Sequence, residues 1–277
     1  MKAVEKIPFF KMQGSGNDFI LIDNRAHLVD PDDLGDFIPN VCRRNHSIGA
    51  DGLILLEESD RADFRWHFFN ADGSRAEMCG NGSRCAARLA HTLGIAPANL
   101  TFETDVGIIA AEVLGRRVKV RMSEPSPVDP QFKIAKNGSE HDLHIVNTGV
   151  PHAVEFVKEL EACEVVDVGR FIRFHEHFQP AGTNVNFAQL LDRSRVAIRT
   201  YERGVEGETL ACGTGAVASA LVAAHLGMAE SPVDVLTRSG EVLQISFRKN
   251  EEGYADVYME GNTALVCEGS LTEEAWT

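Results

Sequence analysis

The sequence carries little positive charge and no long apolar run. Of its 277 residues, 27 are Lys or Arg and 41 are Asp or Glu, so its formal net charge is −14 at pH 7. Because no basic stripe is present to release phosphate counterions, we expect no nucleic-acid partner. No stretch approaches the roughly 20 apolar residues of a membrane helix. Residues 1–6 lead into a strand-like Pro8-Phe9-Phe10 without the apolar segment of a signal peptide. We therefore expect a cytoplasmic protein that does not enter a membrane.

Motifs for metals, disulfides and common cofactors are also missing. The six cysteines could pair as three disulfides by number alone, but the chain size and the missing signal peptide favour reduced thiols. No C-x-x-C or H-x-x-x-H pair occurs, so no metal is expected. His175-Glu176-His177 resembles a ligand cluster, yet we interpret it as a solvated polar turn. No lysine has a recognisable Schiff-base setting, so a pyridoxal cofactor is not supported.

The most informative feature is an internal repeat. Met78-Cys79-Gly80-Asn81-Gly82 returns as Ala211-Cys212-Gly213-Thr214-Gly215, with the two cysteines 133 positions apart. The same offset maps Gly94 onto Gly227 and Gly107 onto Gly240. Matches at one fixed offset indicate a duplicated module. Each copy places a cysteine in a glycine-rich turn directly before an alanine-rich helical stretch.

Short strands dominate the rest of the pattern, with few helices. Long helices are expected after Cys79 and after Cys212, and shorter ones over residues 33–44 and 167–175. Three prolines within residues 125–130 mark the best domain boundary. We predict an α+β fold of two pseudo-symmetric domains from an internal duplication, each a curved, mostly antiparallel sheet wrapped around a main helix. The first domain takes residues 1–124, with 266–277 packing back on it, and the second takes 125–265.

The two turns suit proton transfer at a carbon. A helix N-terminus favours the thiolate through its dipole and its unpaired N–H groups. The following glycines let backbone N–H groups approach a carboxylate and stabilise the charge that develops as an α-carbon loses its proton. One thiolate can remove the α-hydrogen from one face while the second thiol protonates the other face, which inverts the centre. The remaining cysteines (Cys42, Cys85, Cys163 and Cys267) are interpreted as small buried core residues.

Several segments together resemble the diaminopimelate epimerase family over nearly the whole chain. They are residues 11–19 (KMQGSGNDF), 69–74 (FNADGS), 79–85 (CGNGSRC), 201–204 (YERG) and 208–215 (ETLACGTG). The resemblance implies a cofactor-independent isomerase that interconverts LL- and meso-diaminopimelate for lysine and cell-wall synthesis. It also implies a homodimer acting on a small amino-acid substrate.

The resemblance carries over to particular positions. Cys79 and Cys212 match the two catalytic thiols, and His152 and Glu202 match polar residues that support the thiols and hold the reacting amino group. The distal amino-acid end is bound at the positions of Asn17, Asn70, Asn184 and Arg203. The backbone cradle for the reacting carboxylate falls at Gly80, Asn81, Gly213 and Thr214.

Two departures and several alternatives accompany this assignment. Val150 stands where many members have a substrate-contacting asparagine, and Gly52 where some have a glutamine. From the residues alone, Asn17 and Asn70 also fit ordinary turn positions, and His152 fits a satisfied core histidine. The alternatives for the whole chain are a proline racemase, a redox switch or thiol oxidoreductase built on the paired cysteines, and a non-catalytic amino-acid-binding protein.

Overall fold

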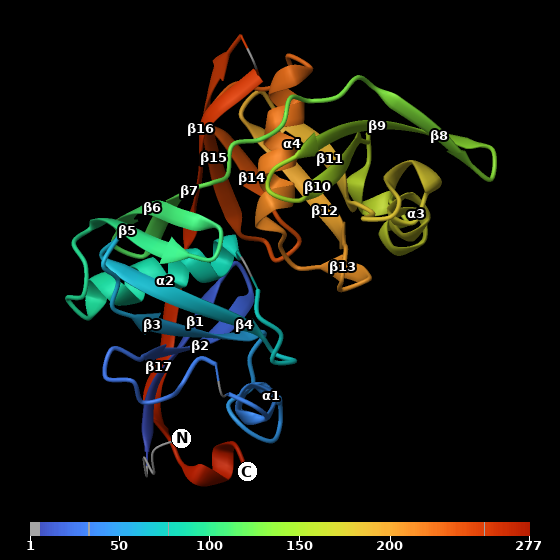
Figure 1. Cartoon of the computed structure of the whole chain (residues 1–277). Helices are drawn as coiled ribbons and strands as arrows, with labels where there is room; N and C mark the ends of the chain where they lie inside the picture. The colour runs from blue at the N-terminus through green and yellow to red at the C-terminus, as the bar shows by residue number, and fades with distance from the viewer. Residues whose placement is uncertain (1–5, 33, 77, 252) are drawn as a thin grey trace. The chain divides into compact units, whose positions relative to one another are not determined.

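The strands of this protein form two sets, each built around a helix of 13 residues (Figure 1). The computed structural model describes residues 6–32, 34–76, 78–251 and 253–277. Residues 1–5, on which the expectation about a signal peptide depends, lie outside the described residues. Two compact units are present: Met1–Val120 with Gly261–Thr277, and Arg121–Glu260. The duplication and the predicted boundary at residues 124–125 stay predictions.

The first unit arranges its strands in the order β17-β1-β2-β3-β4-β5-β6-β7. Neighbouring strands are antiparallel except for β2/β3 and β4/β5, which are parallel. The helix α2 is the crossover between the parallel pair β4/β5. The elements are β1 (Ile7–Gly14), β2 (Asn17–Asp23), α1 (Phe37–Cys42), β3 (Gly52–Glu57), β4 (Phe64–Asn70), α2 (Gly80–Thr92), β5 (Asn99–Thr104), β6 (Gly107–Leu114), β7 (Arg117–Arg121) and β17 (Ala264–Leu271), with a 3-10 turn η3 (Glu273–Ala275).

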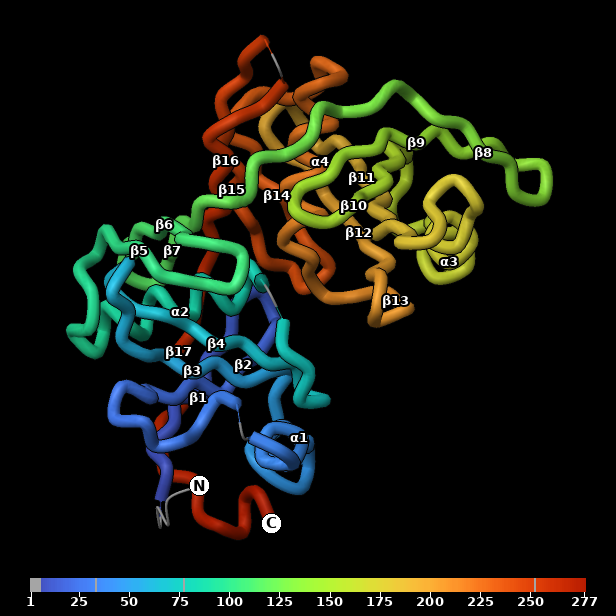
Figure 2. The backbone as a smooth tube through the Cα atoms, in the orientation of Figure 1, coloured from blue at the N-terminus to red at the C-terminus, as the bar shows by residue number. Residues whose placement is uncertain are grey.

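Central strands of this unit are buried on both faces, which explains their continuous apolar runs. In β3, Ile54 and Leu56 pack with α2, whereas Leu53 and Leu55 pack on the opposite face with α1. This alternation follows from the two-residue period of a strand. The C-terminal segment, red in Figure 2, returns to the same unit, where the rings of Trp276 and Phe37 lie 5.5 Å apart.

The second unit is also a mostly antiparallel sheet with two parallel strand pairs, but its sheet branches at β12. Its strands run in the order β8-β9-β10-β11-β12, and β12 then pairs with both β13 and β14, followed by β15 and β16. Only β10/β11 and β12/β14 are parallel among these pairs. The elements are β8 (Phe132–Lys136), β9 (Ser139–Asn147), β10 (Pro151–Phe156), η1 (Leu160–Ala162), α3 (Val165–Arg173), η2 (Glu176–Phe178), β11 (Asn184–Asp192), β12 (Arg195–Glu202), β13 (Gly207–Thr209), α4 (Gly213–His225), β14 (Val233–Leu236), β15 (Val242–Asn250) and β16 (Gly253–Asn262).

Both faces of this sheet are again covered by helices. Val154 and Ala188 pack with α4, while Ala153 and Phe187 pack with α3. The helix α4 is alanine-rich, so it lies close to the strands and buries Gly215–Ala223 completely or nearly so. In each unit the sheet therefore has a main-helix face and a small-helix face.

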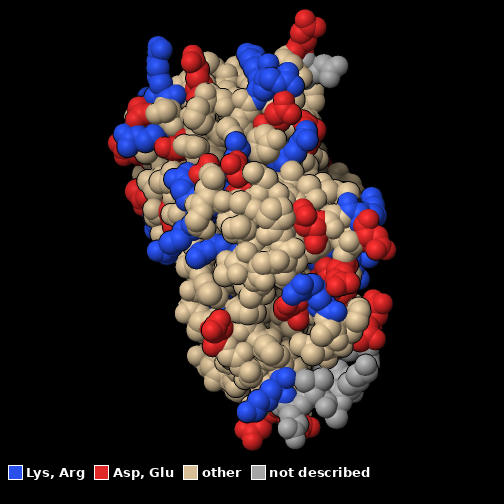
Figure 3. Space-filling model, turned by 90° about the vertical axis from the view of Figure 1, so that its left-hand side faces the viewer, with Lys and Arg blue, Asp and Glu red and all other residues tan. Residues whose placement is uncertain are grey.

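The bounds of α2 and α4 reproduce the sequence offset of 133. Each helix begins directly after its cysteine and ends before a glycine with positive φ, +71° at Gly94 and +70° at Gly227. The helix expected over residues 33–44 is shorter than predicted, because the chain turns extended at Arg43; Asp33 lies outside the described residues. None of the helices in the described residues is long and apolar enough to cross a membrane. On the face drawn in Figure 3, acidic and basic side chains are interspersed.

Candidate active site

Cys79 caps the N-terminus of α2 and can be supported in both protonation states. Its backbone is extended (φ −146°, ψ 114°), and its Sγ accepts a hydrogen bond from the N–H of Gly82 at 3.5 Å. The same thiol donates to Oδ1 of Asn17 at 3.7 Å. A thiolate is stabilised by the N–H group and the helix terminus, whereas a thiol is stabilised by the amide oxygen.

A hydrogen bond to the exposed carboxylate of Asp51 fixes the orientation of the half-buried Asn17. Its Nδ2 donates to Oδ2 of Asp51 at 2.6 Å, so its Oδ1 is the atom presented to Cys79. Arg44 in turn contacts Asp51 at 2.8 Å. Asp51 was not predicted from the sequence as a site residue, although it directly precedes Gly52 at the start of β3.

The turn around Asn81 is tied to the first hairpin by an arginine that the sequence analysis left without a role. Arg84 is fully buried, and its Nη2 donates to Oδ1 of Asn81 at 2.8 Å and to Oγ of Ser15 at 2.9 Å. Nδ2 of Asn81 lies 3.4 Å from Oδ1 of Asn17. The only sequence signal for Arg84 was its place inside the quoted CGNGSRC segment.

Asn70 ends β4 and opens a tight hairpin. Its Nδ2 donates to Oγ of Ser74 at 3.0 Å and its backbone N–H to the carbonyl of Ser74 at 2.9 Å. In this structure the exposed side-chain amide of Asn70 therefore stabilises the turn. Opposite Asn70 in the ladder is Gly52, where a Cβ would lie 2.5 Å from the carbonyl oxygen of Phe69. Packing therefore requires glycine at this position, and a glutamine would displace the strands.

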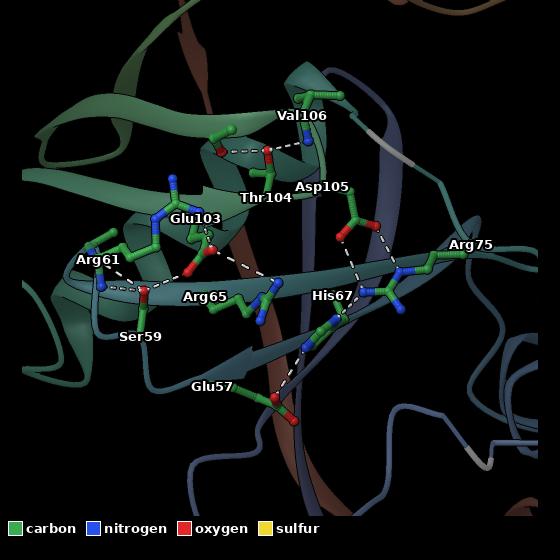
Figure 4. Close-up of polar contacts among 12 residues, drawn as sticks. Glu57, Ser59, Arg61, Arg65, His67, Arg75, Glu103, Thr104, Asp105 and Val106 are labelled. Carbon is green, nitrogen blue, oxygen red and sulfur yellow. Dashed lines mark hydrogen bonds and ion pairs between the residues drawn. The ribbon is translucent and has the colours of Figure 1, made fainter.

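A polar cluster holds that hairpin from the small-helix face (Figure 4). Arg75 pairs with Asp105 at 2.7 Å, and its Nη2 donates to Nδ1 of His67 at 2.6 Å. Nε2 of His67 donates to Glu57 at 3.1 Å. Arg75, which follows the Asn70 turn, is thereby bonded to β4 and to the turn after β5, and through His67 to β3.

Cys212 occupies the equivalent position on α4 with different neighbours. It is 6% exposed, with extended backbone (φ −117°, ψ 108°), and its Sγ lies 3.5 Å from Oγ1 of Thr214. A Cβ on Gly215 would lie 3.2 Å from this sulfur and 2.2 Å from Oδ1 of Asn186. Only glycine fits between these two side chains.

Asn184 and Arg203 lie together in the second unit, as the sequence analysis grouped them. Oδ1 of Asn184 accepts from the backbone N–H of Arg203 at 2.8 Å, and Nδ2 of Asn184 donates to the carbonyl of Pro151 at 3.5 Å. The guanidinium of Arg203 donates to the carbonyl of Ala181 at 3.1 Å. These bonds join the start of β11 to the end of β12.

The pKa values of His152 and Glu202 are shifted in opposite directions. Burial lowers the pKa of the fully buried His152 to about 3, and the charge of Arg203 adds to this effect. Burial raises the pKa of Glu202, with the nearby Thr209 opposing it. The imidazole is therefore neutral at physiological pH, and the carboxyl gains a proton more readily than a solvated glutamate.

Strand alternation places the predicted residues on the main-helix face of each sheet. Asn17 shares its face of β2 with Phe19, and Asn70 shares its face of β4 with Phe68, both of which pack with α2. On the second sheet His152, Asn184 and Glu202 share the α4 face by the same period. These five side chains thus lie on the face of their sheet that packs with the helix whose N-cap is the cysteine.

The remaining cysteines divide into two groups. Cys42 and Cys85 are buried, as predicted. The prediction was wrong for Cys163, which is partly exposed, and for Cys267, which is exposed on β17. Most residues of β17 face solvent, so its apolar sequence does not mark a core strand.

Two other features lie outside this set of residues. The ring of His177 stacks on Phe132 at 4.0 Å, and within the described parts of the chain no three His, Cys, Asp or Glu side chains are arranged to hold a metal ion. A cavity of about 380 Å³ lies in the second unit between the β8–β9 hairpin and α3. Lys136 pairs with Asp167 and His141 with Glu155 in its lining, and none of the predicted site residues lines it.

Known proteins resemble the chain along most of its length. A family model described as diaminopimelate epimerase matches residues 9–128 and 144–266. Curated proteins named diaminopimelate epimerase include one from Aquifex aeolicus (strain VF5), 49% identical with 96% of this chain and 98% of that protein covered. Another, from Archaeoglobus fulgidus, is 42% identical with 96% of each chain covered.

Solved structures of other proteins share the fold at low sequence identity. A PhzF-family phenazine biosynthesis protein of Bacillus anthracis has a TM-score of 0.73 at 16% identity, covering 97% of this chain and 99% of that one. A hydroxyproline epimerase from Agrobacterium vitis has a TM-score of 0.70 at 16% identity, covering 99% and 94%. These likenesses bear on the fold alone, and the predicted two-domain α+β class is confirmed.

Proposed function

The chain belongs to the diaminopimelate epimerase family, and we propose that it interconverts LL- and meso-diaminopimelate by two-thiol proton transfer, without a cofactor. The observation that carries the proposal is the matched setting of Cys79 and Cys212. Each occupies the N-cap position of a 13-residue helix with an extended backbone conformation, and each is followed by glycine. The reaction belongs to the synthesis of lysine and of peptidoglycan precursors.

In this proposal the two cysteines act on opposite faces of one α-carbon. A thiolate on one side removes the α-hydrogen, and the thiol on the other side donates a proton, so the centre is inverted. Backbone N–H groups at Gly80, Asn81, Gly213 and Thr214 hold the reacting carboxylate and stabilise the charge that develops on deprotonation. The bond from Gly82 to Cys79 Sγ supports the thiolate form of that residue.

The other side chains position the substrate. Glu202 accepts from the reacting ammonium group. Arg203 pairs with the distal carboxylate and Asn184, whose amide braces the Arg203 backbone, lies beside it. Asn17 and Asn70 complete the distal contacts. Binding at this unreacting end positions the α-carbon between the thiols.

We also propose that the enzyme works as a cytoplasmic homodimer. Chemistry on two thiols requires a compartment that keeps them reduced. The strand β17 exposes Leu265 (38%) on one face and Val266 (60%) on the other, apolar side chains that a second copy of the chain would cover.

Hydrogen exchange tests the proposed function directly. The purified protein is incubated with LL-diaminopimelate in deuterated water under reducing conditions, with no cofactor added. We expect deuterium at one α-carbon together with formation of the meso isomer. The Cys212→Ala variant serves as the matched control and should form no meso isomer. Absence of both exchange and meso product in the wild type would overturn the proposal.

A further inference from the structure

A buried asparagine contacts the imidazole of His152. Nδ2 of Asn186 lies 2.9 Å from Nδ1 of His152, and both residues are fully buried. They lie on neighbouring parallel strands, β10 and β11, on the face that packs with α4. Sequence reasoning gave Asn186 no role.

A bond to a backbone carbonyl fixes which end of the Asn186 amide meets the ring. Nδ2 also donates to the carbonyl oxygen of Ala153 at 3.3 Å, and a carbonyl can only accept. On the other side, the hydroxyl of Thr200 donates to Oδ1 at 2.9 Å. The amide group at the ring is therefore the NH₂ end, so Nδ1 of His152 accepts and the single proton of the neutral ring is on Nε2.

The Nε2 atom of His152 is buried and has no hydrogen-bond partner among the described residues. An unsatisfied buried donor costs roughly 1–3 kcal/mol, so such a group in a folded protein calls for an explanation. A protonated amino group has no lone pair and cannot serve as the acceptor. A carboxylate or a thiolate can.

The same asparagine adjoins the cysteine turn of the second unit. Gly215, in the first turn of α4, sits between Asn186 Oδ1 and Cys212 Sγ with no room for a Cβ. The carbonyl end of the amide is thus held against α4 by packing and by Thr200, while its NH₂ end is held against His152. If the amide turned over, its Oδ1 would face the carbonyl oxygen of Ala153, and two acceptors cannot form a hydrogen bond.

We infer that Asn186 is a positioning residue that holds His152 as a neutral imidazole with its proton on Nε2, as a fixed donor to an anionic acceptor in the site. The nature of the acceptor rests on the proposed function; the tautomer does not. Of the two residues grouped around the reacting amino group, Glu202 then accepts from the ammonium, and His152 donates to a carboxylate or thiolate.

Nitrogen-15 NMR of the histidine rings tests the tautomer, with the His152→Gln spectrum identifying the His152 signals. In the wild type we expect the Nε2–H neutral pattern, unchanged between pH 5 and pH 8. In Asn186→Asp the carboxylate would accept from Nδ1–H, so the pattern should change to the neutral Nδ1–H form, which leaves no proton on Nε2 to donate. A His152 ring that is protonated, or that carries its proton on Nδ1, in the wild type at pH 7 would overturn the inference.

Activity measurements separate positioning from simple destabilisation. Asn186→Asp should lower kcat about 100-fold or more, the scale for a lost preorganised donor, with a smaller change in KM. The matched control is Asn24→Asp, another fully buried asparagine, which bonds Val29 in the first unit. This variant should be less stable than the wild type. Under conditions where it is folded, its His152 spectrum and its kcat should be unchanged. A wild type without epimerase activity would refute the proposed function, whereas the tautomer assignment would still be tested by the NMR spectrum alone. Equal losses of kcat in both variants, with an unchanged His152 spectrum, would overturn the positioning role.

Discussion

The guanidinium of Arg75 donates to Nδ1 of His67 at 2.6 Å, and this contact requires the imidazole to be neutral. An imidazolium has no lone pair with which to accept that bond. The second ring nitrogen donates to Glu57 at 3.1 Å, so both nitrogens are engaged in one tautomer. Since Arg75 belongs to the chain between Asn70 and Cys79, the charge of a histidine outside the candidate site affects how firmly that chain is held.

Stability should therefore fall as the solution becomes acidic. Burial lowers the pKa of His67, with Arg75 and Arg65 adding to the effect and Glu57 opposing it. Below the unfolded value of about 6.5, the unfolded chain takes up a proton that the folded ring resists. The free energy of unfolding should drop by up to about 1.4 kcal/mol per pH unit until the folded pKa is reached.

The variant His67→Gln isolates this contribution, because glutamine can accept and donate but does not titrate. Urea unfolding at pH 5 to 8 should show a shallower pH dependence in the variant than in the wild type. His152 is present in both proteins, so its own contribution cancels in the difference. Identical slopes would show that His67 does not stay neutral in the folded protein.

Loss of either candidate thiol should abolish epimerisation. Cys79→Ala and Cys212→Ala each remove the acid–base group from one face of the α-carbon. Serine replacements should be almost as inactive, because a hydroxyl is much harder to deprotonate than a thiol. The control is Cys163→Ser, which changes a partly exposed cysteine outside both turns and outside β17 and should keep wild-type turnover. Near-normal turnover in either alanine variant would rule out the two-thiol mechanism.

The parts of the site that the sequence predicted are those set by local pattern. The glycine-rich turns, the alanine-rich helices and the fixed offset between them are visible in short segments, and the helix bounds agree with them. Period-two alternation also puts Asn184 and Asn186 on one face of β11. The bond from Asn186 to His152 could not be predicted, because it joins residues 34 positions apart across a parallel pair.

Tertiary context decided the cases that were missed or wrong. Arg84 was given no role from the sequence, and the structure shows it fully buried, with Asn81 and Ser15 accepting its hydrogen bonds. Cys267 reads as a core residue in an apolar run, but its strand faces solvent. The sequence pattern alone does not show which residues bond a buried charged side chain, or whether other elements pack on a given strand.

Mild oxidation provides a test of whether the two thiols share one substrate. An oxidant should inactivate the protein by linking Cys79 to Cys212, and dithiothreitol should restore activity. Such a bond requires Cα atoms about 4.4–6.8 Å apart. Peptide mass spectrometry identifies the linked residues, and a bond from Cys79 to Cys85 instead would contradict a shared site.

Gly215→Ala should damage the second unit and its chemistry together. The added Cβ would lie 2.2 Å from Oδ1 of Asn186 and 3.2 Å from Sγ of Cys212, so side chains or the helix start must shift. We expect a loss of about 1–3 kcal/mol in the free energy of unfolding, the scale for overpacking, and a lower kcat. Gly207→Ala is the control, since a Cβ there meets nothing within 4 Å and its φ is not positive. Equal thermal stability of the two variants would show that the turn is not packed as described.

Arg203 should determine substrate choice more than it determines the chemical step. Its guanidinium is held by the carbonyl of Ala181, and its backbone by Asn184. A planar guanidinium can pair bidentately with the distal carboxylate, a geometry that an ammonium cannot reproduce. Arg203→Lys retains the positive charge, which adds to the larger effect of burial in lowering the pKa of His152. The variant therefore changes the geometry of the carboxylate contact without removing the charge. We expect kcat/KM to fall by the equivalent of about 2–4 kcal/mol, the scale for losing one partner of a buried charge pair.

Lysine, which lacks the distal carboxylate, should be a very poor substrate for the wild type. Steady-state kinetics on both substrates checks this, and equal turnover of lysine and diaminopimelate would instead indicate a broad amino-acid racemase.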